Sequence, residues 1–168
     1  MMRKIIKTTF LFYIACTILS CNNYDRKNDN IIFRPRWWIE IDLKNRSIFV
    51  ELTKYKGKLA LSEKEEKIII DSFEKNGIGN LKGEYHVANE DVTAPIIDFT
   101  FVVFKRDKKI LDAAINEEYN TQLNSKSVDD KIASFRDELK LVLRNNRSYK
   151  LAEKNLEDYM VKHKIFML

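Results

Sequence analysis

The first twenty residues limit the fold most strongly, because they have the pattern of a segment that is removed from the chain. Residues 1–7 hold three basic residues and no acid, an almost unbroken apolar run covers 10–19, and the chain turns polar at Asn22. This is the arrangement of a secretory signal. The apolar run of about 10 to 13 residues is shorter than the roughly 20 that a transmembrane helix needs. We therefore predict a signal peptide at residues 1–20 rather than a permanent membrane span.

The end of this segment, Ile18-Leu19-Ser20-Cys21, resembles the lipobox of bacterial lipoproteins. The resemblance covers residues 1–21 only. It implies cleavage between Ser20 and Cys21, a diacylglycerol on the Cys21 sulfur and an acyl chain on the new amino terminus. Asn22, where an aspartate favours retention in the inner membrane, resembles the pattern of outer-membrane lipoproteins. The alternatives are an ordinary cleaved signal and a buried N-terminal helix with incidental cysteines.

The charge balance changes once the signal is removed. The whole chain carries 30 basic and 25 acidic residues, but three of the basic ones lie in the signal. The remaining chain is close to neutral and gives no electrostatic reason to expect nucleic-acid binding. Cys16 leaves with the signal and Cys21 is used by the lipid, so thiol catalysis and disulfides are not expected.

Beyond the signal, the pattern predicts one small domain on a tether. Residues 21–34 are Asn-rich, charged and poor in apolar side chains, which predicts a lipidated cysteine followed by a flexible linker. Residues 35–168 are predicted to form a single α+β domain, and we recognise no domain family in residues 31–168. The expected order is ββ-α-(β)ββ-αα, with an antiparallel sheet of four to five strands and about three helices packed on one face.

The expected strands follow from alternating apolar residues. They are a hairpin of 37–43 and 46–55 around Lys44-Asn45, a short ambiguous strand at 82–87, and a central strand at 96–104 with its partner at 110–117. The expected helices are 63–76, 127–144 and 148–163. Ser62 and Glu65 form a capping box and Gly77 ends the first helix. Ser148 is the predicted cap of the last helix, which should pair antiparallel with the one before it.

Few residues suggest catalysis. Glu40, Asp42, Glu51 and Asp98 lie on predicted strands and could converge as a carboxylate pair, which is the chemistry of glycoside hydrolysis. His86 stands among carboxylates and could bind a metal or transfer a proton. A solvated sheet face and a solvated loop explain these residues more simply, and His163 is expected to be exposed or interfacial. Nucleotide-binding, serine-hydrolase and zinc-protease motifs do not occur, so no catalytic residue, metal or cofactor is predicted.

The dipeptide Trp37-Trp38 is the candidate binding feature. On a strand the two rings point to opposite faces, and Trp38 shares its face with Glu40 and Asp42, so Trp38 is the ring expected to be exposed. An exposed indole could bind a protein partner or lie at the membrane interface. The simpler explanation is a tryptophan that covers the outer face of the sheet.

Together these features predict a small lipid-anchored cell-envelope protein, in the outer membrane, that acts by binding another protein. An immunity-type inhibitor and an accessory subunit of an envelope assembly are two concrete forms of this hypothesis. The alternative is a lipid-anchored hydrolase of envelope or external glycans or peptides that uses Glu40, Asp42, Asp98 or His86. A structural lipoprotein without a specific ligand is a third hypothesis.

Overall fold

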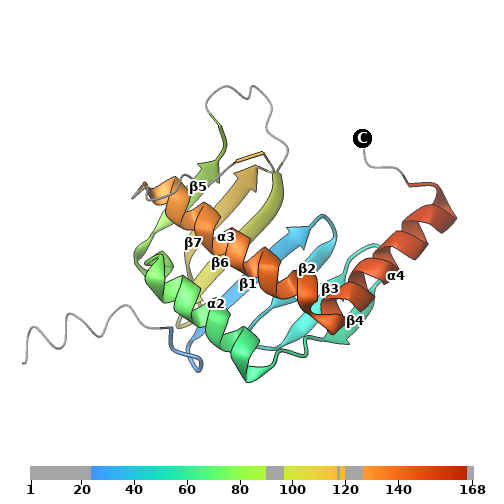
Figure 1. Cartoon of the computed structure of the whole chain (residues 1–168), viewed down its shortest axis with the longest axis horizontal. Helices are drawn as coiled ribbons and strands as arrows, with labels where there is room; N and C mark the ends of the chain where they lie inside the picture. Colours follow the sequence, from blue (N-terminus) through green and yellow to red (C-terminus); the bar gives the residue numbers. More distant parts are fainter. Residues whose placement is uncertain (1–23, 90–96, 117, 120–126, 166–168) are drawn as a thin grey trace, which may run out of the picture.

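A computed structural model describes residues 24–89, 97–116, 118–119 and 127–165, which form a mixed seven-stranded sheet with helices on one face. Figure 1 shows the helices α2, α3 and α4 lying across the same side of the sheet. The elements in chain order are β1 (Asp29–Arg36), β2 (Ile39–Asp42), β3 (Ser47–Val50), β4 (Tyr55–Lys58), α2 (Glu63–Lys75), the 3₁₀ helix η2 (Ile78–Asn80), β5 (Gly83–Val87), β6 (Ile97–Lys105), β7 (Lys108–Asn116), α3 (Val128–Asn145) and α4 (Arg147–His163).

The α+β class is confirmed, and the sheet is larger than the four to five strands expected. The strand order is β4-β3-β2-β1-β6-β7-β5. Every pairing is antiparallel except that of β5 with β7, which is parallel. In the part of the chain that the structure describes, no helix is both long and apolar enough to span a bilayer.

The core lies between the sheet and the three helices. Alternate residues of the central strands point toward the helices and are fully buried, as Ile31 and Phe33 are on β1 and Phe99 and Phe101 on β6. Phe135 of α3 packs edge-to-face on Phe101, with ring centroids 5.2 Å apart. Since each such side chain contributes roughly 1.5–3 kcal/mol on burial, this layer dominates the stability of the fold.

The flexible tether predicted for residues 21–34 is wrong for the part that the structure describes. Residues 29–34 belong to β1, which pairs with β2 on one side and β6 on the other. Pro35 lies where the β1–β2 register shifts, and a proline is tolerated at such an irregularity. The domain therefore starts before residue 35. Ser20, Cys21 and the rest of residues 1–23 lie outside the described residues.

The predicted hairpin is confirmed around its turn and wrong at its ends. Residues 43–46 form the turn between β2 and β3, and Ile48 and Val50 are buried as expected. The strand predicted for 37–43 is shorter, because Trp37 and Trp38 form a turn. The strand predicted for 46–55 is divided by a turn at 51–54, after which β4 adds an edge strand to the sheet.

The predicted central strand and its partner are confirmed as β6 and β7, and the ambiguous segment is the strand β5. The helix predicted at 63–76 is confirmed as α2, with its capping box formed by Ser62 and Glu65. The last helix differs from expectation in two ways. Its N-cap is Asn146, which accepts hydrogen bonds from the backbone N–H groups of Ser148 and Tyr149. In Figure 1, α4 diverges from α3 and covers β3 and β4 rather than lying antiparallel along α3.

Candidate functional site

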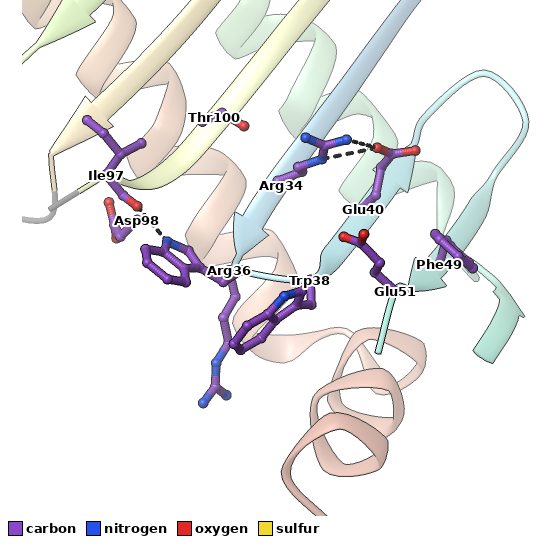
Figure 2. Close-up of a pocket in the computed structure, with 10 residues that line it drawn as sticks. Arg34, Arg36, Trp38, Glu40, Phe49, Glu51, Ile97, Asp98 and Thr100 are labelled. Atoms are coloured by element: carbon purple, nitrogen blue, oxygen red, sulfur yellow. Dashed lines mark hydrogen bonds and ion pairs between the residues drawn. The ribbon is translucent and has the colours of Figure 1, made fainter. Parts of the chain in front are cut away.

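The candidate site, called the tryptophan site below, is a pocket of about 520 Å³ where β1 turns into β2. It opens on the sheet face that the helices leave uncovered, and Figure 2 shows the side chains around it. Strands β1, β2, β3 and β6 and the turns between them supply its lining. The lining residues are Arg34, Arg36, Trp37, Trp38, Glu40, Phe49, Glu51, Ile97, Asp98 and Thr100.

The two tryptophans form the turn between β1 and β2, which corrects the prediction that they lie on one strand. Trp38 has a φ of 66°, in the left-handed region that tryptophan rarely adopts. The rings therefore stand edge-to-face, with centroids 5.9 Å apart, instead of pointing to opposite faces. Trp37 is 53 % exposed, whereas Trp38 is partly buried against the core. The prediction that Trp38 is the exposed ring is wrong.

The exposed indole of Trp37 is held in one orientation. Its Nε1–H donates a hydrogen bond of 2.8 Å to the backbone carbonyl of Ile97, across the gap between the β1–β2 turn and β6. The Trp38 carbonyl accepts a 2.8 Å hydrogen bond from the backbone N–H of Glu51, which ties the same turn to the β3–β4 turn. The aromatic part of the site is thus rigid although one ring is exposed.

Two arginines of β1 frame the pocket, and the sequence reasoning missed both. Arg34 donates from Nη2 and Nε to one carboxylate oxygen of Glu40, at 2.6 and 3.1 Å. Arg36 extends the other way and forms a 2.8 Å ion pair with Glu157 of α4. The signal that could have found them is the adjacency of Arg34 and Arg36 to the tryptophan pair in the sequence.

Asp98 lies at the start of β6, where the register with β7 is irregular. Its Oδ2 accepts a hydrogen bond from the ammonium group of Lys140 on α3. Its Oδ1 is buried and has no hydrogen-bond partner among the described residues. An unsatisfied buried acceptor of this kind is rare in folded proteins.

The structure brings together only some of the predicted carboxylates. Glu40, Glu51 and Asp98 all line the tryptophan site. Asp42 instead stabilises the β2–β3 turn, where its two oxygens accept 2.8 Å hydrogen bonds from the backbone and side-chain nitrogens of Asn45.

Neither histidine joins these carboxylates. His86 is exposed on the edge strand β5, four strand spacings from β2, a separation of about 19 Å. His163 lies at the end of α4 against Tyr159, with ring centroids 4.2 Å apart.

Among the described residues, no group of three or more His, Cys, Asp or Glu side chains is placed to hold a metal ion. The tryptophan site combines a fixed aromatic surface, ion-paired arginines and carboxylates. Comparison of the chain with known protein families, with curated proteins and with solved structures found no match.

Proposed function

We propose that this chain is a lipid-anchored cell-envelope protein, attached through Cys21, that acts by binding another protein at the tryptophan site. The single observation that carries the binding proposal is the exposed indole of Trp37, fixed by its hydrogen bond to Ile97. A rigid aromatic side chain loses little conformational entropy when a partner covers it, and tryptophan is among the residues that dominate binding energy at interfaces.

The surroundings of Trp37 support the same proposal. Arginine is also enriched among interface residues of high binding energy, and Arg34 and Arg36 flank the tryptophan turn. Both guanidinium groups are already oriented by carboxylates, so their positions are defined before a partner arrives. The left-handed φ of Trp38 is a backbone strain of the kind that gathers at functional sites.

The lipid attachment at Cys21 is proposed from the lipobox resemblance. Location in the outer membrane is proposed because the residue after Cys21 is Asn22 and not an aspartate. A permanently attached domain with a rigid binding site suits an immunity-type inhibitor, which intercepts a toxin at the membrane. It equally suits an accessory subunit of an envelope assembly.

The test is co-purification from solubilised membranes with matched variants. Trp37→Ala is expected to lose a stoichiometric partner that the wild-type protein retains. The control is Leu151→Ala, which removes an equally exposed apolar side chain from α4, away from the site. A partner retained by Trp37→Ala, or lost equally from both variants, would contradict the proposal.

A second candidate, the lipid-anchored hydrolase, is favoured by one observation. Glu40, Glu51 and Asp98 line the same pocket, and a pair of carboxyl groups about 5 to 10 Å apart can hydrolyse a glycosidic bond. Against it, Glu40 and Asp98 are each held by a cation, Arg34 and Lys140.

Activity profiling on envelope glycans and peptides separates the two candidates. Glu40→Gln, Glu51→Gln and Asp98→Asn test the pocket, whereas Asp42→Asn and His86→Gln are the controls outside it. Turnover that only the pocket variants lose would favour the hydrolase.

A further inference from the structure

The end of the sheet opposite the tryptophan site gathers the segments 25–28, 43–46 and 105–109, the last being the β6–β7 turn with its flanking strand residues, which together are called the basic end below. The backbone N–H of Arg106 donates a 2.8 Å hydrogen bond to the carbonyl of Asn28. The Lys44 ammonium lies 3.6 Å from the Asp107 carboxylate. The three segments therefore lie side by side, and Figure 1 shows the first described residues, in blue, at this end.

The basic end carries a marked excess of positive charge. Its three segments hold eight basic and two acidic residues, and the adjoining strand residues Asp29 and Asp42 add two acids, whereas segments 36–38, 51–54 and 97–98 around the tryptophan site hold two of each. Some of this charge is neutralised. Arg26 and Arg46 share the single carboxylate of Glu66, Lys44 pairs with Asp107, and Lys109 pairs with Asp112 and Glu84. Lys27, Arg106 and Lys108 are exposed and form no ion pair with any residue that the structure describes.

The β6–β7 turn presents two of these charges in a fixed position. Arg106 and Asp107 have φ values of 49° and 60°, so both central residues of this two-residue turn are left-handed. Asn-Gly is the common choice for such a turn, because glycine and asparagine tolerate this conformation best. Here Arg106 and Asp107 occupy the two left-handed positions at the tip and Lys108 follows them, which places two basic side chains and one acidic side chain at the extreme end of the sheet.

The basic end lies closer to the proposed lipid at Cys21 than a flexible tether over residues 21–34 would place it. The Tyr24 ring packs edge-to-face on Phe73, at 5.6 Å between centroids, and the Tyr24 backbone N–H donates to the carboxylate of Glu74. The domain therefore includes Tyr24, three residues after Cys21, so the chain between them spans at most about 11 Å. That is close to the length of roughly 8 to 10 Å over which salt screens charge.

We propose that the basic end is a docking surface for an anionic phospholipid bilayer, and that it orients the domain on the membrane. This inference rests on the lipid attachment at Cys21 included in the proposed function. A lipid chain combined with a cluster of basic residues is a recognised way to hold a protein at a membrane surface. The tryptophan site, roughly 25 Å away along the eight residues of β1, then faces away from the bilayer.

The experiment uses the lipidated protein in vesicles, after intact mass has established the modification. Residue-specific acylation rates of Lys27 and Lys109 are compared in vesicles of phosphatidylcholine alone and with added phosphatidylglycerol, with Lys150 on α4 as the internal reference. One basic residue near an anionic surface gains about five-fold in binding, and only the amine that is free of the surface is acylated, so acylation of Lys27 and Lys109 should slow by about that factor in the anionic vesicles. Salt at about 1 M, where screening acts within about 3 Å, should abolish the difference.

Two double variants provide the matched comparison. Arg106→Asn with Lys108→Gln removes two charges from the basic end, and asparagine suits the left-handed position of Arg106. Lys54→Asn with Lys154→Gln removes two charges elsewhere, and Lys54 has a similar φ of 58°. We expect the first variant to lose the slowing caused by phosphatidylglycerol and the second to keep it.

Equal acylation rates in the two kinds of vesicle would overturn the inference, because any protection would then come from the tether and not from charge. Equal slowing in the two double variants would overturn it as well. An unmodified Cys21 in the mass measurement would instead contradict the lipid attachment. Partner retention by the basic-end variant is measured separately, so a failure at the basic end is distinguishable from a failure at the tryptophan site.

Discussion

The indole Nε1–H of Trp37 donates a 2.8 Å hydrogen bond to the backbone carbonyl of Ile97, which links the β1–β2 turn to the start of β6. Residues 60 positions apart in the sequence are thereby joined at one end of the sheet. The bond fixes an exposed aromatic ring beside Arg36 and Asp98, and this arrangement underlies the binding proposal.

Comparing Trp37→Phe with Trp37→Ala separates the contribution of the hydrogen bond that orients the ring from the contribution of the ring itself. The phenyl ring keeps most of the apolar surface but cannot donate to Ile97, so partner affinity should fall by about 1 kcal/mol, against 2 kcal/mol or more for Trp37→Ala. Because the side chain is exposed, the free energy of unfolding should change by less than about 1 kcal/mol in either variant. Calorimetric titration with the captured partner and urea denaturation measure the two quantities. Equal affinities of the two variants would show that the hydrogen bond contributes nothing.

Tyr24→Ala tests whether Tyr24 is part of the folded domain. The half-buried ring contacts Phe73, and its removal should lower the free energy of unfolding by about 2 kcal/mol, less than for a fully buried aromatic residue. Lys27→Ala, three residues later and exposed, is the control and should change it by less than about 0.5 kcal/mol. Urea denaturation of the two variants decides the matter. Equal free energies of unfolding for the two variants would show that Tyr24 does not stabilise the domain and belongs to a flexible tether.

Asn146 connects α4 to the loop before α2. Its Oδ1 caps α4, and its Nδ2 donates to the Ala60 carbonyl at 2.8 Å and to Glu65. Asn146→Ala removes the cap and leaves buried polar groups unpaired, so it should cost roughly 2 to 3 kcal/mol of stability. The neighbouring Asn145→Ala is the control, since Asn145 is exposed and its replacement should change the free energy of unfolding little. Thermal unfolding compares them, and similar midpoints for the two variants would refute the role of Asn146.

The capping box should give a pH-dependent part of the stability. The Ser62 hydroxyl, which donates to the Glu65 carboxylate at 2.6 Å, lowers the pKa of Glu65, and the Ser62 backbone N–H and the Asn146 amide add to this. A lowered folded-state pKa means that ionised Glu65 stabilises the fold above its ordinary pKa of about 4.3, and that this contribution is lost as the pH falls through the lowered value.

Glu65→Gln is therefore expected to be less stable than the wild type by about 1 kcal/mol near neutral pH, and the difference should shrink in acid. Urea denaturation at a series of pH values between about 7 and 3 measures it. A difference that stays constant through the acidic range would show that the carboxylate charge is not the cause.

The elements that the sequence predicted well are those whose signals are local. The capping box of Ser62 and Glu65 marked the start of α2, and the alternation through Phe99, Phe101 and Val103 marked an interior strand. In each case the residues that determine the element lie within it.

The elements that were mispredicted depend on tertiary contacts. The segment 29–36 has only three consecutive apolar residues between polar flanks, and β2 and β6 make it a central strand by pairing on both sides. Similarly, Asn146 rather than Ser148 caps α4, because its amide also reaches Ala60.

The candidate site was predicted in part. The tryptophan pair was recognised, but strand periodicity could not show that Trp38 adopts a left-handed turn and that Trp37 is the exposed ring. The sequence identified the candidate carboxylates, but which of them lie near one another depends on the order of the strands in the sheet. Glu40 and Asp98 line the same pocket because only β1 separates β2 from β6, and His86 is left on the far edge.

The most direct test of the central claim is site-specific photocrosslinking of the lipidated protein in intact cells. A photoreactive phenylalanine analogue placed at Trp37 is expected to give a covalent adduct with one discrete protein. The same analogue at Leu151, exposed on α4, should give none. The absence of a discrete adduct at Trp37, or the same adduct from both positions, would contradict the account.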